Sequence, residues 1–115
     1  MPKLPITLAC HLYDRTRAIR DGEIPVEGVE VNFISLHVTE IFWRMCQYQE
    51  FDASEMSMGA HITLIGSGNS PFVGIPVFPS RVFRHANMFV RAGNGVERPE
   101  DLRGRRIGVP EYGMT

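Results

Sequence analysis

The sequence predicts an α/β fold, in which a partly parallel sheet is flanked by helices, and two observations carry this prediction. Apolar and polar residues alternate over residues 29–33, which is the period of a strand with one buried face. An amphipathic helix over 38–46 and another short strand over 51–57 follow. Strand, helix and strand at this spacing form a βαβ unit, whose strands run parallel with a right-handed crossover.

The segments before this unit are expected to begin the same sheet. Residues 6–10 form a short apolar run that a histidine ends, and this pattern suits a buried strand. Residues 14–20 are expected to form one or two helical turns, which an Asp-Gly pair ends. Residues 25–28 have the composition of a turn and lead into the next strand.

The helix over 38–46 has the clearest pattern in the chain. Its apolar residues recur at helical spacing and form one stripe, made of Val38, Ile41, Phe42, Met45 and Cys46. Thr39 is the expected N-cap, and Glu40 places a negative charge in the first turn, where it is favoured. Trp43, beside the stripe, is expected in the core or at an interface.

The second half of the chain is expected to add one long helix and more strands. Residues 58–65 are predicted as a second crossover helix, closed by a glycine-rich loop at 66–69. A turn at 93–95 and a one-turn helix at 98–102 are expected further on. Strands are predicted at 72–78, 86–91 and 106–109.

The composition is that of one ordinary globular domain. The chain has 115 residues and 13.0 kDa, with 43% hydrophobic and 22% charged residues. Twelve Lys and Arg against thirteen Asp and Glu give a net charge of −1, which argues against a nucleic-acid partner. No apolar run approaches the roughly 20 residues of a membrane-spanning helix, so no membrane partner is expected.

The cysteines and the N-terminus indicate a cytoplasmic protein. Cys10 and Cys46 form no CxxC pair and are expected to be buried thiols in a reducing compartment. Residues 1–5 are too short and too rich in proline to form a secretory signal. The sequence leaves open whether the protein forms a homo-oligomer.

Three clusters of polar side chains follow predicted strands. Ligands of open α/β sheets bind beyond the carboxyl ends of the strands, so these clusters are the candidate site. The clusters are His11, Tyr13, Asp14 and Arg15; then Ser54, Glu55 and Ser57; then Ser80, Arg81, Arg84 and His85. Arginine there can hold a carboxylate through two parallel hydrogen bonds. The alternative is that these are solvated loop residues.

The four histidines do not suggest a metal site. They lie far apart in the sequence and form no H-x-H or HExxH pattern, so zinc is not expected. His37 and His61 are interpreted as surface or packing residues. His85 is the better candidate for chemistry, because imidazole titrates in the range that suits proton transfer. The alternative is that His85 only caps the loop backbone.

Several stretches resemble known families. Residues 99–109 are similar to a segment of type 2 periplasmic-binding-protein-like folds. The 4,5-dihydroxyphthalate decarboxylase family is resembled by residues 8–10 with 13–16, 51–57, 75–81 with 83–85, and 108–112 with 114–115. The departures are Gly113, where a larger side chain is expected, and His11, where a small one is expected.

The resemblance implies a fold and a domain organisation. Members of that family resemble two-lobed binding proteins, which hold the ligand between their lobes. Residues 1–115 are therefore expected to form an incomplete first lobe of such a fold. The half-built α/β unit at the end predicts a chain truncated after Thr115.

The resemblance also implies a reaction, the decarboxylation of 4,5-dihydroxyphthalate to 3,4-dihydroxybenzoate and carbon dioxide. This chemistry needs a proton donor, a base and cationic groups for the carboxylates, so no cofactor is expected. From residue chemistry we assign His85 as the acid and Glu55 or Asp14 as the base. Arg15, Arg81 and Arg84 would bind carboxylates, and further binding residues would be Tyr13, Ser57, Ser80, Glu111 and Tyr112.

The competing hypothesis is a cytoplasmic solute-binding module on the same fold, without catalysis. The same arginines would then bind a small anionic aromatic or dicarboxylate ligand, and His85 would only donate a hydrogen bond. Fold alone does not decide between the two. The partner is a small aromatic carboxylate in the first case and a ligand of similar charge in the second.

Overall fold

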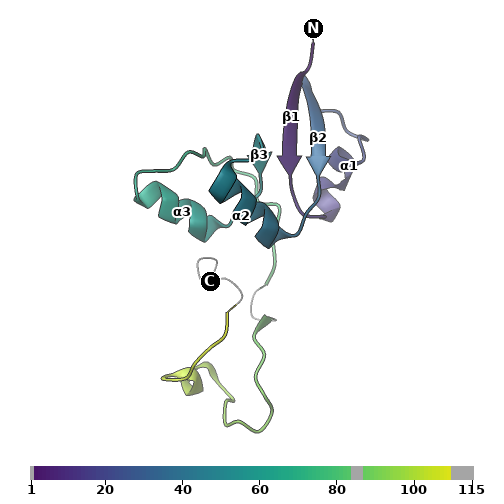
Figure 1. Cartoon of the computed structure of the whole chain (residues 1–115). Helices are drawn as coiled ribbons and strands as arrows, with labels where there is room; N and C mark the ends of the chain where they lie inside the picture. Colours follow the sequence, from purple (N-terminus) through teal and green to yellow (C-terminus); the bar gives the residue numbers. More distant parts are fainter. Residues whose placement is uncertain (1, 84–86, 110–115) are drawn as a thin grey trace.

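The computed structural model describes residues 2–83 and 87–109, and Figure 1 shows its elements. The strands and helices follow one another as β1 (Leu4–Ala9), η1 (Asp14–Thr16), α1 (Arg17–Arg20), β2 (Val29–Ile34), α2 (Val38–Tyr48), β3 (Ala53–Ser54), α3 (Met58–Gly66) and η3 (Pro99–Leu102). The α/β prediction is confirmed, with its helices and strands in the expected order up to α3.

The sheet has three strands in the order β2-β1-β3, and both pairings are parallel. The β1–β2 ladder runs from Leu4 opposite Val29 to Ala9 opposite Ile34. β3 pairs only with the carboxyl end of β1, where Ala9 lies opposite Ser54. The strand expected over 51–57 is therefore confirmed in position but is much shorter. β1 is the central strand, and its carboxyl end has a neighbour on both sides.

The core lies between this sheet and α2. Ile41 and Met45 of α2 are buried against Ala9 of β1, together with Phe42 and Phe51. The predicted apolar stripe is thus the face of α2 that packs on the sheet. Trp43 lies outside the core, exposed and edge-on to Tyr48, so the core location is wrong and the interface location stays a prediction.

The start of α2 corrects one prediction. The N-cap is His37 and not Thr39, because the helix already begins at Val38. The His37 ring nitrogen Nδ1 accepts a hydrogen bond from the Thr39 backbone N–H at 3.4 Å. A ring nitrogen of His37 thus accepts the capping hydrogen bond that a Ser, Thr or Asp oxygen usually accepts.

The strands predicted in the second half do not form. Residues 72–78 and 106–109 contain no strand, nor do residues 87–91, while Ala86 lies outside the described residues. These segments have strand-like composition but no neighbouring strand to pair with, and three prolines in and beside the first remove backbone donors. Most of their apolar side chains are exposed, to 92% at Val73 and 88% at Phe89, although Phe72 packs against the core.

The turns and the short helix of this region are confirmed. The Asn94 backbone N–H donates to Arg91 O at 3.3 Å within the expected turn. η3 matches the expected one-turn helix and ends before Gly104, whose φ of +75° is accessible to glycine at little cost. Within residues 2–83 and 87–109, no helix is long and apolar enough to cross a bilayer.

The packing of α2 predicts that shortening a buried side chain lowers the free energy of unfolding far more than shortening an exposed one. Ile41→Ala removes a fully buried side chain and should lower the free energy of unfolding by about 2–5 kcal/mol. Gln47→Ala, on the exposed side of the same helix, is the matched control and should change it by less than about 0.5 kcal/mol. Urea unfolding followed by circular dichroism measures both, and equal effects would contradict this account of the core.

Candidate ligand site at the carboxyl ends of β1 and β3

The order of the strands places a candidate site beyond β1 and β3. The chain leaves β1 towards α1 and β2 on one side of the sheet, and it leaves β3 towards α3 on the other (Figure 1). Where neighbouring parallel strands lead away in opposite directions, a crevice opens at their carboxyl ends, and ligands of open α/β sheets bind there. Two of the three predicted polar clusters lie in these two loops.

Glu55 is the centre of this edge. Its side chain is buried, with 9% of the residue exposed, and both carboxylate oxygens are engaged. Oε1 accepts the His11 backbone N–H at 2.5 Å, and Oε2 accepts the Tyr13 hydroxyl at 2.8 Å. The Glu55 backbone N–H in turn donates to Ala9 O at 3.1 Å. One residue after β3 therefore fixes the loop that follows β1.

The surroundings of Glu55 keep two neighbouring groups protonated. Burial, reinforced by the hydrogen bond and the charge of the Glu55 carboxylate, raises the pKa of Tyr13 to about 12, although a hydrogen bond with Ser80 opposes the rise. Burial and the same carboxylate raise the pKa of the Cys10 thiol to about 12. At neutral pH Tyr13 is therefore a hydrogen-bond donor, and Cys10 is not a nucleophile.

Arg15 brings the third cluster to the same edge. Its guanidinium Nη1 donates to Pro79 O at 2.5 Å, so that residues 79–80 lie beside the loop after β1. Its Nε lies 3.6 Å from the Asp14 carboxylate, and its side chain is 44% exposed. The hydrogen bond between Ser80 and Tyr13 is a second contact between residues 79–80 and the loop after β1. Ser80 of the third cluster thus lies beside the first two clusters, while Arg84 and His85 lie outside the described residues.

The other predicted site residues lie in different environments. Asp14 has a 90% exposed side chain that accepts the Arg15 backbone N–H at 2.8 Å. Ser57 is buried and caps α3 by accepting the Ala60 N–H. The Ser54 hydroxyl is buried and has no hydrogen-bond partner within the part of the chain that the structure describes. Four predicted residues lie outside the described residues: Arg84, His85, Glu111 and Tyr112.

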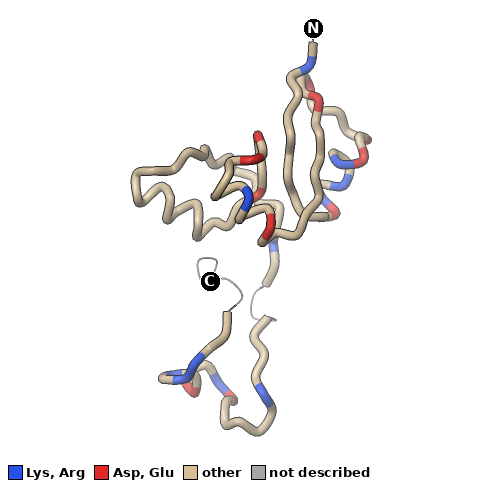
Figure 2. The backbone as a smooth tube through the Cα atoms, in the orientation of Figure 1, with Lys and Arg blue, Asp and Glu red and all other residues tan. Residues whose placement is uncertain are grey.

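Arg81 differs from the other arginines of residues 2–83. Arg17 and Arg20 form ion pairs with Asp21, and Arg44 pairs with Glu40 and Glu50. Figure 2 shows this interspersion of acidic and basic residues along α1 and α2. Arg81 is exposed and forms no ion pair with any described residue, which leaves its guanidinium available to an anion.

His11, which the sequence placed in the first polar cluster without a specific role, is a component of this edge. The ring is half-buried, and its Nδ1 donates to Leu36 O at 3.0 Å. It lies edge-on to Tyr13, with ring centroids 5.5 Å apart, and edge-on to His37 at 6.0 Å. The signal available in the sequence was the position of His11 directly after the buried end of β1. Its proximity to Glu55 exists only in the folded chain.

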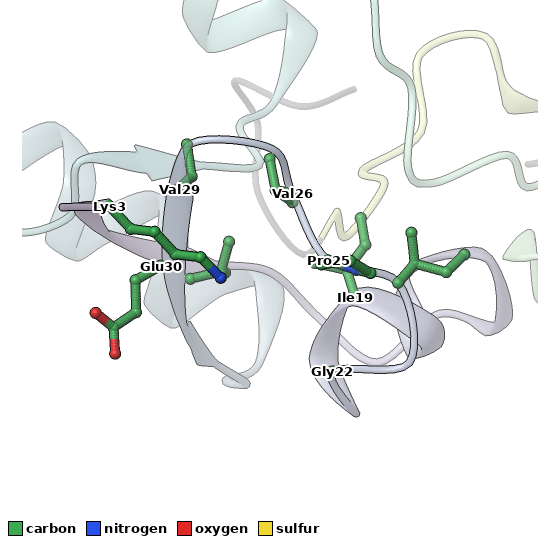
Figure 3. A pocket seen from close by; sticks show the side chains of 9 residues that line it. Lys3, Ile19, Gly22, Pro25, Val26, Val29 and Glu30 are labelled. Carbon is green, nitrogen blue, oxygen red and sulfur yellow. The ribbon is translucent and has the colours of Figure 1, made fainter. Parts of the chain in front are cut away.

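A hollow elsewhere in the molecule is less suited to chemistry. It has a volume of about 200 Å³ and lies against the outer side of β2, where Ile19, Val26 and Val29 line it together with Lys3 and Glu30 (Figure 3). None of the predicted site residues borders it. Among the described residues, no three His, Cys, Asp or Glu side chains gather closely enough to bind a metal ion.

The fold and this edge place the chain among α/β proteins whose ligand sites lie beyond the carboxyl ends of parallel strands. Over all 115 residues it is 42% identical to a protein of Comamonas testosteroni and 40% identical to one of Pseudomonas putida, both named 4,5-dihydroxyphthalate decarboxylase. The resemblance expected from the sequence is thereby confirmed. The chain spans 35% and 45% of the lengths of these two relatives. No protein-family model matches the chain.

The hydrogen bonding of Glu55 predicts how Tyr13 titrates. Glu55→Gln removes the negative charge that disfavours the phenolate, so the pKa of Tyr13 should fall from about 12 towards 10, while burial keeps it from reaching the ordinary value. Glu30→Gln, which removes an exposed carboxylate from β2, should leave it unchanged. Carbon-13 NMR of the Tyr13 ring carbon resolves this residue from the other tyrosines. An unchanged pKa in Glu55→Gln would contradict the assigned contact.

Proposed function

We propose that this chain supplies part of the substrate site of a non-oxidative decarboxylase that acts on a hydroxylated aromatic dicarboxylate. The observation that carries the proposal is the assembly around the buried Glu55 carboxylate, where Tyr13, Arg15 and Ser80 meet at one sheet edge. The names of the two relatives support 4,5-dihydroxyphthalate as the substrate. The product would be 3,4-dihydroxybenzoate, released with carbon dioxide.

The chemistry places simple demands on the site. A general acid adds a proton to the ring carbon that carries one carboxylate. The bond from that carbon to the carboxylate then breaks, its electron pair restores the aromatic ring, and carbon dioxide leaves. The ring hydroxyl para to it pushes electron density towards the same carbon, most strongly when a base accepts the hydroxyl proton. Cationic groups hold the carboxylates in place.

The described residues can meet some of these chemical demands. Arg81 and the exposed part of Arg15 offer planar guanidinium groups to the carboxylates. Glu55 suits the base better than Asp14, because it is buried within the edge whereas the Asp14 side chain is 90% exposed. Of the about four lone-pair sites of a carboxylate, three are occupied at Glu55, by the His11 N–H, the Tyr13 hydroxyl and the Cys10 thiol.

The remaining parts of the proposal concern residues and regions beyond this edge. We assign the acid to His85 and further binding roles to Arg84, Glu111 and Tyr112 on their chemistry alone. The described sheet is proposed to belong to the first lobe of a two-lobed fold of the type 2 periplasmic-binding-protein kind. A second lobe would close over the edge at β1 and β3 and exclude water, which strengthens the charge interactions there. We propose a cytoplasmic location.

The test uses the protein that carries this sequence. Wild type should bind 4,5-dihydroxyphthalate and release carbon dioxide from it. Arg81→Ala should weaken binding by about 10–100-fold, because a charge-assisted hydrogen bond to a carboxylate is lost. Arg17→Ala, which removes an arginine paired with Asp21 on α1, is the matched control and should bind as wild type does. Calorimetric titration and evolved carbon dioxide are the two measurements.

The outcomes separate the two hypotheses for function. Tight binding without carbon dioxide release would replace the decarboxylase with a solute-binding module. Binding that is the same in wild type and Arg81→Ala would remove Arg81 from the site. If the protein binds no aromatic dicarboxylate, the proposed function is wrong.

A further inference from the structure

His11 is held at the candidate site from two directions. Its backbone N–H donates to the Glu55 carboxylate, which ties it to the end of β3. Its ring nitrogen Nδ1 bonds to Leu36 O, in the segment that joins β2 to α2. The Tyr13 and His37 rings lie edge-on to it and restrict how the imidazole can turn. The ring is therefore positioned by contacts that a solvated loop histidine would not have.

The bond to Leu36 decides which ring nitrogen can accept a hydrogen bond. A carbonyl oxygen only accepts, so Nδ1 must carry the hydrogen in this contact. In the neutral imidazole, Nε2 then holds a lone pair and no hydrogen. Within the part of the chain that the structure describes, Nε2 has no hydrogen-bond partner. Position and tautomer together make Nε2 an acceptor at the sheet edge.

Most other polar groups at this edge already have hydrogen-bond partners or can only donate hydrogen bonds. Arginine side chains only donate, and the Tyr13 hydroxyl already donates to Glu55. The Glu55 carboxylate already accepts bonds from His11, Tyr13 and Cys10, and its remaining capacity is assigned to the hydroxyl para to the departing carboxylate, so the other ring hydroxyl needs a different acceptor. A hydroxylated aromatic dicarboxylate carries two kinds of polar group, namely carboxylates that match arginine and ring hydroxyls that need an acceptor. His11 Nε2 fits the second kind.

We infer that His11 is the residue that recognises a ring hydroxyl of the ligand, by accepting a hydrogen bond from that hydroxyl at Nε2. The inference rests on the proposed function, since it names how the same site selects its substrate. A site that offers a fixed acceptor to a ligand hydroxyl discriminates against the analogue without it, because the acceptor is then left unpaired. His11 therefore sets the preference for 4,5-dihydroxyphthalate over phthalate.

The test compares these two ligands in wild type and in two variants of the protein that carries this sequence. Wild type should bind 4,5-dihydroxyphthalate about tenfold or more tightly than phthalate. His11→Phe removes both ring nitrogens, and His11→Asn keeps a donor for Leu36 O but has no group at the Nε2 position. Both variants should lose most of this preference while binding phthalate within about threefold of wild type, because the arginines are untouched. His61→Asn, on α3, is the control and should keep the preference.

Comparing two ligands separates recognition from mere structural support. A structural role would weaken both ligands equally, and an unchanged preference in His11→Phe and His11→Asn would overturn the inference while the proposed function stands. Equal binding of both ligands by wild type would overturn it in the same way. If wild type binds neither ligand, the proposed function fails and this inference fails with it. Nitrogen-15 NMR of the His11 ring tests the tautomer independently of any ligand, and hydrogen on Nε2 instead of Nδ1 would contradict the mechanism.

Discussion

The buried Glu55 carboxylate is the interaction on which the candidate site depends. It accepts a backbone N–H and a phenol from the loop after β1 while its own backbone pairs with Ala9. Without it, the Tyr13 hydroxyl and the His11 N–H would lose their partner at a half-buried position, and such donors are costly to leave unpaired. The same carboxylate adds to the effect of burial in raising the pKa values of Tyr13 and Cys10, so one residue shapes both the geometry and the electrostatics of the edge.

This charge is held in place by the apolar packing behind it. Ala9, the last residue of β1, is fully buried against Ile41 of α2, so the strand end from which the loop begins is fixed by the core. β1 has a parallel neighbour on both sides at this end, which removes freedom from its backbone. The site is thus built directly beside the buried core, and a fixed position of this kind favours the orientation of a reacting ligand.

Features set by local sequence were predictable, and features set by distant partners were not. The period of two before Ile34 and the apolar stripe of α2 record burial directly, so both elements were predicted from sequence. The segment 72–78 is as apolar as a strand. A strand exists only when another strand pairs with it, however, and no local pattern indicates whether such a partner is present. Clustering of polar residues after strands located the candidate edge. The role of His11 was missed because its contacts with Leu36 and Glu55 join positions 25 and 44 residues apart.

The assignment of the ligand site to this edge depends on where an aromatic dicarboxylate binds. A nitrogen-15 chemical-shift map, recorded while 4,5-dihydroxyphthalate is added to the protein that carries this sequence, tests this directly. We expect the largest shifts at the amides of residues 10–15, 54–57 and 80–81, with none at the hollow lined by Lys3, Val26 and Glu30. Shifts confined to that hollow, or no shifts at all, would contradict the assignment of the ligand site to the edge of β1 and β3.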